Sequence, residues 1–245
     1  MLFYTSNGGT SWTSTSIPKP YILADVSFSD AHHGWLLASQ GPATAQEPID
    51  LYHTSDSGKT WSQVLSKAES NKLLLGIKTG MAFVNSSTGW ITVDNGQHPG
   101  QVVLYITHDG GHSWQLQSVP VPRSLKKYYA RPLAPTFSSA QKGLMPVVFS
   151  NGKTVIYTTQ NGGQSWQSST PVPVSQVVSM SVVKGTIYLT DGTTIYDSND
   201  NGQSWGRWHV VIKSGEQIGD VTANGAYVAG NGDVSIVELN SKENQ

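Results

Sequence analysis

The stretch Ser55-Asp56-Ser57-Gly58-Lys59-Thr60-Trp61 is the clearest copy of a motif that occurs five times in this chain of 245 residues. The copies end at tryptophans in positions 12, 61, 114, 166 and 205, so successive copies lie 49, 53, 52 and 39 residues apart. A repeat of roughly 40–50 residues is typical of a propeller or a solenoid. The spacing therefore predicts a repeat architecture before any local pattern is considered.

A second landmark precedes each tryptophan motif and consists of an apolar residue, a short polar turn, a glycine and another residue. Its clear copies run from Phe28 to Trp35, from Phe83 to Trp90 and from Phe137 to Leu144, and shortened copies run from Met180 to Thr186 and from Val221 to Ala226. Short stretches in which apolar and polar residues alternate flank this landmark and the tryptophan motif. No sustained helical periodicity is present. Each repeat is therefore predicted to hold four short antiparallel strands joined by Gly, Asn and Asp turns.

Four strands per repeat predict an all-β fold, a β-propeller with five blades in a single domain over residues 1–245. Four blades are expected at about 20–66, 77–120, 132–172 and 177–212. The fifth blade is expected to combine residues 1–17 with residues 217–240, so that N- and C-terminal strands close the ring. The pattern predicts one strand more than five blades of four strands need. The alternative is therefore that the chain is a fragment of a larger, six- or seven-bladed propeller.

The motif follows the pattern S-x-D-x-G-x-[ST]-W of the Asp-box, or BNR repeat. In such a turn the Asp or Asn side chain accepts backbone N–H groups, and glycine supplies a positive φ. We expect each tryptophan to tuck its ring between neighbouring strands or blades. The structural residues are Asn7 and Trp12, Asp56 and Trp61, Asp109 and Trp114, Asn161 and Trp166, and Asp200 and Trp205. Each turn offers one carboxylate at most, which argues against a calcium loop, so we expect no metal and no cofactor.

The combined signature Phe-x-[Ser/Asn]…Gly-Trp, followed by Tyr-x-[Thr/Ser]-x-[Asp/Asn]-x-Gly-x-Ser-Trp, resembles the photosystem II stability and assembly factor family and its bacterial relatives. The resemblance covers about residues 2–240. It implies a propeller that acts as an assembly scaffold and not as an enzyme. Known members are larger, commonly seven-bladed, so five repeats depart from the family pattern.

The alternative from another class is a carbohydrate-active enzyme or a glycan-binding protein, with its site at the mouth of the axial channel. A sialidase needs an arginine triad spread over several blades, but the three arginines here are Arg123, Arg131 and Arg207, and two of them lie in one loop. A glycosidase needs two facing carboxylates. Asp25 and Asp220 precede inner strands, and we expect them to cap turns or solvate loops instead. No catalytic residue is assigned.

The loop Pro120–Pro132 is the candidate binding surface. It combines basic and aromatic side chains of the kinds found at protein interfaces: Arg123, Lys126, Lys127, Tyr128, Tyr129 and Arg131. A protein partner is favoured, and a glycan is the alternative. The net charge of −1 argues against nucleic acid. The long connections are expected on the face opposite the tryptophan motifs; they are Ser39–Asp50, Ser66–Lys72, Asp94–Gln101 and Val119–Pro135.

Composition bears on the compartment. Only 13% of the residues are charged, which favours a secreted or cell-surface bacterial protein, with the cytoplasm as the alternative. Cysteine is absent, which excludes disulfides and leaves the compartment open. Met1-Leu2-Phe3-Tyr4 leads straight into the first motif, so we expect that an export signal is not part of these residues. No apolar run is long enough to span a membrane. The histidines at 32, 33, 108 and 112 are expected to be exposed turn residues without a metal.

Overall fold

The computed structural model describes residues 2–17, 21–42, 46–94, 96–222, 225–230 and 233–237. These residues are arranged almost entirely in antiparallel strands, with one short helix, α1 (Lys67–Leu73), and one 3₁₀ turn, η1 (Arg123–Leu125). They form two compact units. Unit 1 comprises Met1–His98, Val102–Val119 and Arg131–Ala140, and unit 2 comprises Pro99–Gln101, Pro120–Ala130 and Gln141–Gln245.

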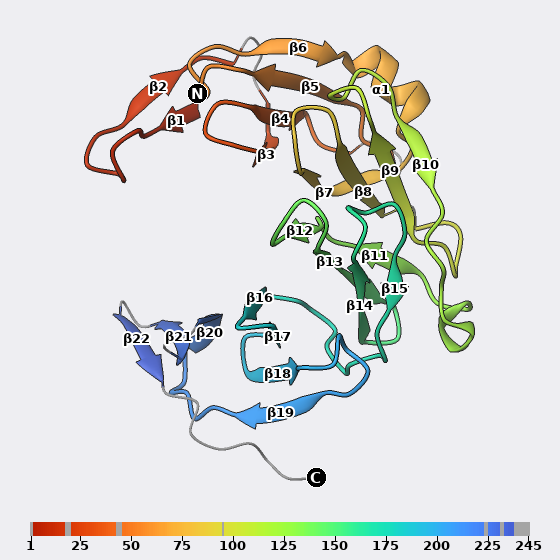
Figure 1. Cartoon of the computed structure of the whole chain (residues 1–245), viewed down its shortest axis with the longest axis vertical. Helices are drawn as coiled ribbons and strands as arrows, with labels where there is room; N and C mark the ends of the chain where they lie inside the picture. The colour runs from red at the N-terminus through yellow and green to blue at the C-terminus, as the bar shows by residue number, and fades with distance from the viewer. Residues whose placement is uncertain are drawn as a thin grey trace. The chain divides into compact units, whose positions relative to one another are not determined.

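Unit 1 contains two complete four-stranded sheets in which the strands follow one another in chain order (Figure 1). The first sheet consists of β3 (Leu23–Phe28), β4 (Gly34–Ser39), β5 (Ile49–Thr54) and β6 (Ser62–Leu65). The second consists of β7 (Ile77–Phe83), β8 (Gly89–Asp94), β9 (Val103–Thr107) and β10 (Gln115–Gln117). The unit also holds the hairpin of β1 (Leu2–Tyr4) and β2 (Thr13–Thr15), and the short strand β12 (Thr136–Phe137).

Unit 2 repeats the same antiparallel order. In it β13 (Gly143–Phe149), β14 (Lys153–Thr159) and β15 (Gln167–Ser168) pair in sequence. A four-stranded sheet follows, made of β16 (Ser179–Val183), β17 (Thr186–Thr190), β18 (Thr194–Ser198) and β19 (Gly206–His209). The last sheet has the three strands β20 (Glu216–Thr222), β21 (Gly225–Gly230) and β22 (Asp233–Val237). Strand β11 (Ala130–Pro132) stands at the boundary between the two units.

The predicted four-stranded antiparallel repeat is confirmed. In each complete sheet the landmark turn joins the first two strands, and the tryptophan motif joins the third strand to the fourth. The strands β1 and β2 flank a tryptophan motif and therefore correspond to the third and fourth strands of a repeat. The number of blades, the single domain and ring closure by the two ends stay predictions.

Helix α1 corrects the expectation of a loop over Ser66–Lys72. The Ser66 side chain accepts a hydrogen bond from the backbone N–H of Glu69, and the Glu69 carboxylate accepts one from the N–H of Ser66. This reciprocal capping box stabilises the first turn of a helix. The side chain of Lys78 donates to the carbonyl groups of Leu74 and Gly76 just beyond the helix. The sequence signal, Ser-x-x-Glu, was present but too short to produce helical periodicity.

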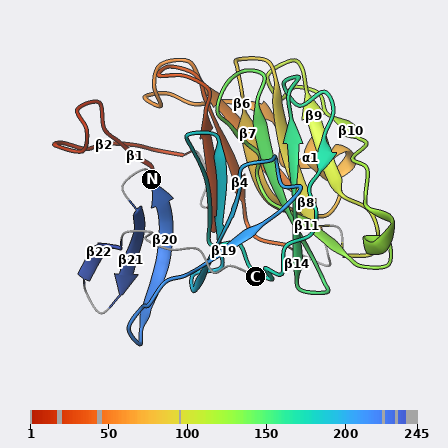
Figure 2. The ribbon, with the colours of Figure 1, turned by 60° about the horizontal axis from the view of Figure 1, so that its bottom comes forward.

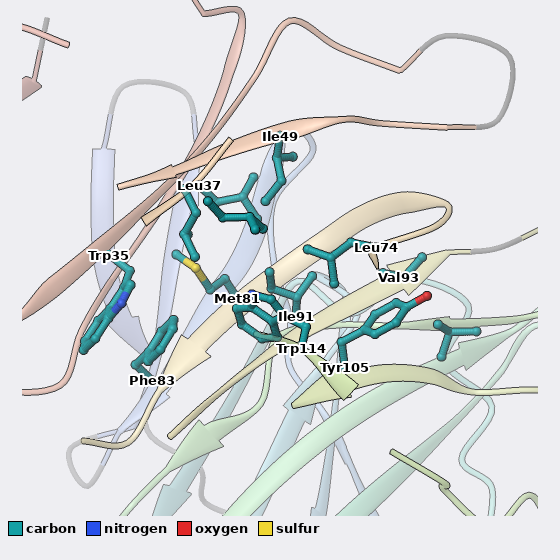
Figure 3. Close-up of a cluster of buried hydrophobic side chains, with 13 residues drawn as sticks. Trp35, Leu37, Ile49, Leu74, Met81, Phe83, Ile91, Val93, Tyr105 and Trp114 are labelled. Atoms are coloured by element: carbon teal, nitrogen blue, oxygen red, sulfur yellow. The ribbon is translucent and has the colours of Figure 1, made fainter. Parts of the chain in front are cut away.

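The core of unit 1 lies between the β3–β6 sheet and the β7–β10 sheet (Figure 3). The ring of Trp35 from β4 stacks on that of Phe83 from β7, with centroids 3.7 Å apart and planes 2° from parallel. Polar side chains join the two inner strands, since the Asp25 carboxylate and the Ser27 hydroxyl accept the backbone N–H groups of Met81 and Phe83. The two sheets are therefore joined by both apolar packing and specific hydrogen bonds.

The β1–β2 hairpin packs on the other face of the β3–β6 sheet, and its turn projects away from that sheet (Figure 2). Leu2 and Ile17 contact a small cluster built around Leu36, Ala38 and Tyr52. No helix in the described ranges is long and apolar enough to cross a membrane.

Candidate functional site

The five tryptophan motifs form turns of nearly identical geometry, here called the tryptophan turns (residues 5–12, 54–61, 107–114, 159–166 and 198–205). The Asp or Asn Oδ1 atom accepts the backbone N–H four residues later at 2.8–3.0 Å in all five. A hydroxyl two residues before the Asp or Asn accepts the N–H of the turn glycine at 2.8–3.0 Å. In the second turn that glycine is Gly58, with φ of +84°, a conformation that other residues adopt only with strain.

The Asp turns differ from the Asn turns in one bond. The second carboxylate oxygen of Asp56 accepts the hydroxyl of Thr60 at 2.6 Å, whereas the amide nitrogen of Asn161 donates to the hydroxyl of Ser165 at 2.9 Å. The hydrogen bonds from Thr60, through its hydroxyl and its N–H, lower the pKa of Asp56 to about 2. Asn completes the same turn without a charge, which explains why both residues occur at this position.

The tryptophan rings are not all buried, and this corrects the expectation that each one tucks between strands or blades. Trp114 and Trp166 are only 7% and 4% exposed, but Trp12 is 61% exposed. Trp61 and Trp205 are half-buried. Because the turn itself is the same in every copy, the burial of the ring depends on what packs beside the turn.

Residues 120–130 of the basic loop (residues 120–132) belong to unit 2 and are held in place there by hydrogen bonds to the backbone. The carbonyl of Tyr128 accepts the N–H of Gly100 at 2.8 Å, and the carbonyl of Tyr129 accepts the N–H of Ser150 at 2.9 Å. The phenol of Tyr157 donates to the carbonyl of Pro120 at 2.9 Å. Leu125, in the middle of the loop, is 2% exposed. The loop is therefore a fixed surface feature and not a solvated linker.

The cationic side chains of this loop point to solvent. Arg123, Lys126, Lys127 and Arg131 are all exposed, and Tyr129 is exposed beside them. The ammonium group of Lys127 lies 5.2 Å from the ring centroid of Tyr128, within the range of a cation–π contact. In the parts of the chain that the structure describes, no carboxylate oxygen lies within 4 Å of these four cations. Among the described residues, their charges are thus not neutralised by an ion pair.

The prediction that Asp25 and Asp220 cap turns or solvate loops is wrong, because both residues lie within strands. The carboxylate of Asp25 in β3 accepts the N–H of Met81, and burial raises the pKa of Asp25 above its ordinary value. Asp220 in β20 is exposed and accepts the hydroxyl of Ser179 at 2.8 Å. Each carboxylate therefore links the inner strands of two successive repeats.

One acid–tyrosine pair occurs in unit 1, between Asp50 of β5 and Tyr21. The phenol of Tyr21 donates to Asp50 at 2.9 Å and lies 2.8 Å from the phenol of Tyr52. The same carboxylate accepts the side chain of Gln63 and the backbone N–H of Lys67. Burial of the Tyr21 phenol raises its pKa, and its hydrogen bonds to Tyr52 and Asp50 raise it further. The Asp50 carboxylate therefore joins Tyr21, Gln63 and the start of helix α1.

The described residues contain no group of three or more His, Cys, Asp or Glu side chains arranged to hold a metal ion. The four histidines lie in turns, as the sequence suggested, and three of them are exposed: His32 in the β3–β4 turn, and His108 and His112 in the third tryptophan turn. His33, also in the β3–β4 turn, is half-buried and stacks on His53. The site that the geometry supports is therefore the basic loop.

Comparison with known proteins agrees with the repeat pattern. Residues 5–182 match the family model described as Photosynthesis system II assembly factor YCF48. The chain belongs to this family. A curated relative from Oryza sativa subsp. japonica, the chloroplastic photosystem II stability/assembly factor HCF136, is 26% identical over 117 residues, which make up 45% of this chain and 24% of the rice protein.

Two solved YCF48 structures resemble the chain at 20% identity. YCF48 from Cyanidioschyzon merolae gives a TM-score of 0.60 and covers 95% of this chain and 71% of its own. A structure described as YCF48 bound to D1 peptide gives 0.58 and covers 89% of this chain and 65% of its own. These likenesses confirm the β-propeller fold. The chain matches about two thirds of the length of these structures and about a quarter of the rice relative.

Proposed function

We propose that this member of the YCF48 family is a non-catalytic protein-binding scaffold and that its basic loop binds an acidic, extended segment of a partner protein. The observation that carries the proposal is the set of exposed cations that have no carboxylate partner among the described residues, on a loop fixed by backbone hydrogen bonds. Support also comes from the relative described as bound to D1 peptide, because that ligand is a peptide.

The physical argument rests on preorganisation. A loop that is already ordered loses little conformational entropy when a ligand binds, so more of the interaction energy appears as affinity. Arginine binds carboxylates in a bidentate geometry, and tyrosine contributes a large rigid contact area. Because the net charge of the chain is −1, the local positive charge of the loop would steer an acidic segment to this site and not to the rest of the surface. We place the protein in an extracytoplasmic compartment on the basis of its composition.

The test replaces Lys126, Lys127 and Arg131 together with glutamate. All three side chains are exposed, so we expect an unchanged thermal midpoint. Binding of the D1 peptide used with the relative, and recovery of partners from the source cell with a tagged chain, should fall at least about tenfold, which corresponds to about 1.4 kcal/mol. The measurements are fluorescence anisotropy for the peptide and quantitative mass spectrometry for the partners.

The matched control is the triple glutamate variant of Lys59, Lys153 and Arg207, which are exposed cations outside the basic loop, in the β5–β6 turn, in β14 and in β19. It changes the net charge by the same amount but leaves the basic loop intact, so it should retain binding. Equal losses in both triple variants would show that only the overall charge matters and would reject the assignment to the loop. Retained binding in the loop variant would reject it as well.

A further inference from the structure

The middle of the basic loop, residues 122–128, consists of two successive tight turns. The N–H of Leu125 donates to the carbonyl of Pro122 at 2.9 Å, and the N–H of Tyr128 donates to the carbonyl of Leu125 at 3.0 Å. Leu125 is 2% exposed, so its buried side chain anchors both turns in unit 2. The exposed side chain of Lys126 therefore extends from a backbone that turns about one buried leucine.

Gly100, in the connection between β8 and β9, contacts the second of these turns. Its N–H donates to the carbonyl of Tyr128 at 2.8 Å. Its φ is +72°, and a Cβ at this position would overlap the carbonyl oxygen of Lys126 and lie 2.9 Å from the Cα atom of the same residue. The positive φ and the close approach both require glycine. The backbone of Lys126 therefore lies directly against Gly100.

The β13–β14 hairpin fixes the loop on either side of this contact. The phenol of Tyr157 donates to the carbonyl of Pro120 at the start of the loop. Near its end, the N–H of Ser150 donates to the carbonyl of Tyr129 at 2.9 Å, and the Ser150 hydroxyl accepts the N–H of Tyr129 at 3.2 Å. Because both ends are held in this way, a backbone shift at Gly100 would be taken up by the middle of the loop.

The two lysines in the middle of the loop differ in what they contact. The ammonium group of Lys127 lies 5.2 Å from the ring centroid of Tyr128, in a cation–π contact. Lys126 follows the 3₁₀ turn η1 with φ of −59° and ψ of −16°, and its side chain is exposed. Within the described ranges, no carboxylate oxygen lies within 4 Å of its ammonium group. Lys126 therefore combines a charge that no carboxylate offsets with a backbone position that depends on Gly100.

We infer that Gly100 is a positioning residue of the binding site, which sets the place of Lys126 and thereby the affinity of the basic loop for the carboxylates of an acidic segment. This inference rests on the proposed function. Binding groups have to be held within about 0.5 Å of their productive position. A side chain at position 100 would force the carbonyl of Lys126 to move until the contact reached an ordinary distance of about 3.5 Å. Gly100 has no side chain with which to touch a ligand, so it acts through Lys126.

The probe is a fluorescein-labelled oligoglutamate peptide, whose binding to the whole chain is followed by fluorescence anisotropy. Gly100→Ala should weaken binding at least about tenfold, because it displaces the backbone of Lys126. The matched control is Gly185→Ala in the β16–β17 turn of unit 2. Gly185 has φ of +85°, and among the described residues a Cβ there would have no neighbour within 4 Å. This control adds similar backbone strain and should bind the peptide as the unmodified chain does.

A double-mutant cycle separates positioning from a loss of stability. In a chain that carries Lys126→Gln, Gly100→Ala should weaken binding further by no more than about threefold, because the side chain that it misplaces has lost its charge. The thermal midpoint should fall equally on Gly100→Ala with and without Lys126→Gln, since the Lys126 side chain is exposed. Equal losses of binding in the two backgrounds would show that Gly100 has a structural role only and would overturn the inference.

A measurement on the isotope-labelled chain tests the same link without any change at position 100. When the oligoglutamate peptide binds, the amide signal of Gly100 should shift, because its N–H donates to the carbonyl of Tyr128 in the turn that carries Lys126. The shift should be much smaller in Lys126→Gln, and the amide signal of Gly185 should not move in either chain. A Gly100 signal that stays in place while the peptide binds would overturn the inference.

The triple glutamate variant of Lys126, Lys127 and Arg131 separates the two ways of failing. If it binds the oligoglutamate peptide as tightly as the unmodified chain does, or if the unmodified chain does not bind the peptide, the proposed function fails and the positioning role fails with it. If the triple variant loses binding while Gly100→Ala retains it, the proposed function stands and only the positioning role is rejected.

Discussion

Phe28 and Phe83 occupy the same position in two successive repeats and differ in what lies above them. Each rests on a landmark glycine and meets the tryptophan of its own turn edge-on. Phe83 is covered by Trp35 and is 5% exposed, whereas Phe28 is 45% exposed. The comparison teaches that the contacts of the landmark phenylalanine within its own repeat follow from local sequence. The burial of its ring depends on what the neighbouring repeat places on it.

The largest difference is expected from truncating the two rings. Phe83→Ala should lower the free energy of unfolding by about 3–5 kcal/mol, because it empties a closed core site. Phe28→Ala should cost about 1 kcal/mol, because half of the ring is already in water. Urea unfolding of both variants, followed by circular dichroism, measures the two values. Similar losses of unfolding free energy would mean that the ring of Phe28 is covered in solution.

A smaller difference is expected from adding a methyl group to two turn glycines. Gly111 and Gly9 both have positive φ, +98° and +89°, so alanine strains the backbone by about 1–2 kcal/mol at either position. At Gly111 the new Cβ would also lie 2.7 Å from a methyl group of buried Leu51, whereas at Gly9 its nearest neighbour would be 3.8 Å away. Gly111→Ala should therefore be more destabilising by about 1 kcal/mol, the low end for overpacking. Thermal unfolding tests this, and equal midpoint shifts would contradict it.

The smallest effect is expected from lowering the pH, through the histidine beside the stacked rings of Trp35 and Phe83. The ring of His53 lies 4.8 Å from Trp35 and stacks on His33, which is hydrogen-bonded to Asp30. Burial lowers the pKa of His53 below 6.5, and the nearby His33 and His112 lower it further. The folded chain therefore takes up this proton less readily than the unfolded chain, and stability should fall as the pH drops below about 6.5.

His53→Leu removes this group, so its unfolding free energy should decline less between pH 7.5 and pH 5.5 than that of the unmodified chain. Urea titrations at several pH values in that interval measure the difference. The ring of His53 lies beside Trp35, which covers Phe83, and not beside Phe28. Protonation of His53 should therefore weaken the packing around Phe83. An unchanged pH dependence in His53→Leu would remove the histidine from this account.

The elements that could be predicted from the sequence are those whose contacts are local. The turn around Asp56 is completed by Thr54, Gly58 and Thr60, all within four residues of it, so the motif itself predicts the turn and the two flanking strands. Helix α1 was missed, although Ser66 and Glu69 form a capping box. The basic loop could be identified from its composition, but its fixed conformation depends on Gly100 and Ser150, which lie far from it in sequence.

The sequence by itself determined the β-propeller repeat, the position of the turns and the family, because a hydrogen-bonded turn and an alternating strand depend on neighbours within a few residues. Only the tertiary structure decided which equivalent side chains are buried. Trp12 and Trp114 end turns with the same backbone hydrogen bonds, yet they are 61% and 7% exposed. The physical reason is that the apolar area removed from water depends on which surface packs beside a turn, and that surface comes from another repeat.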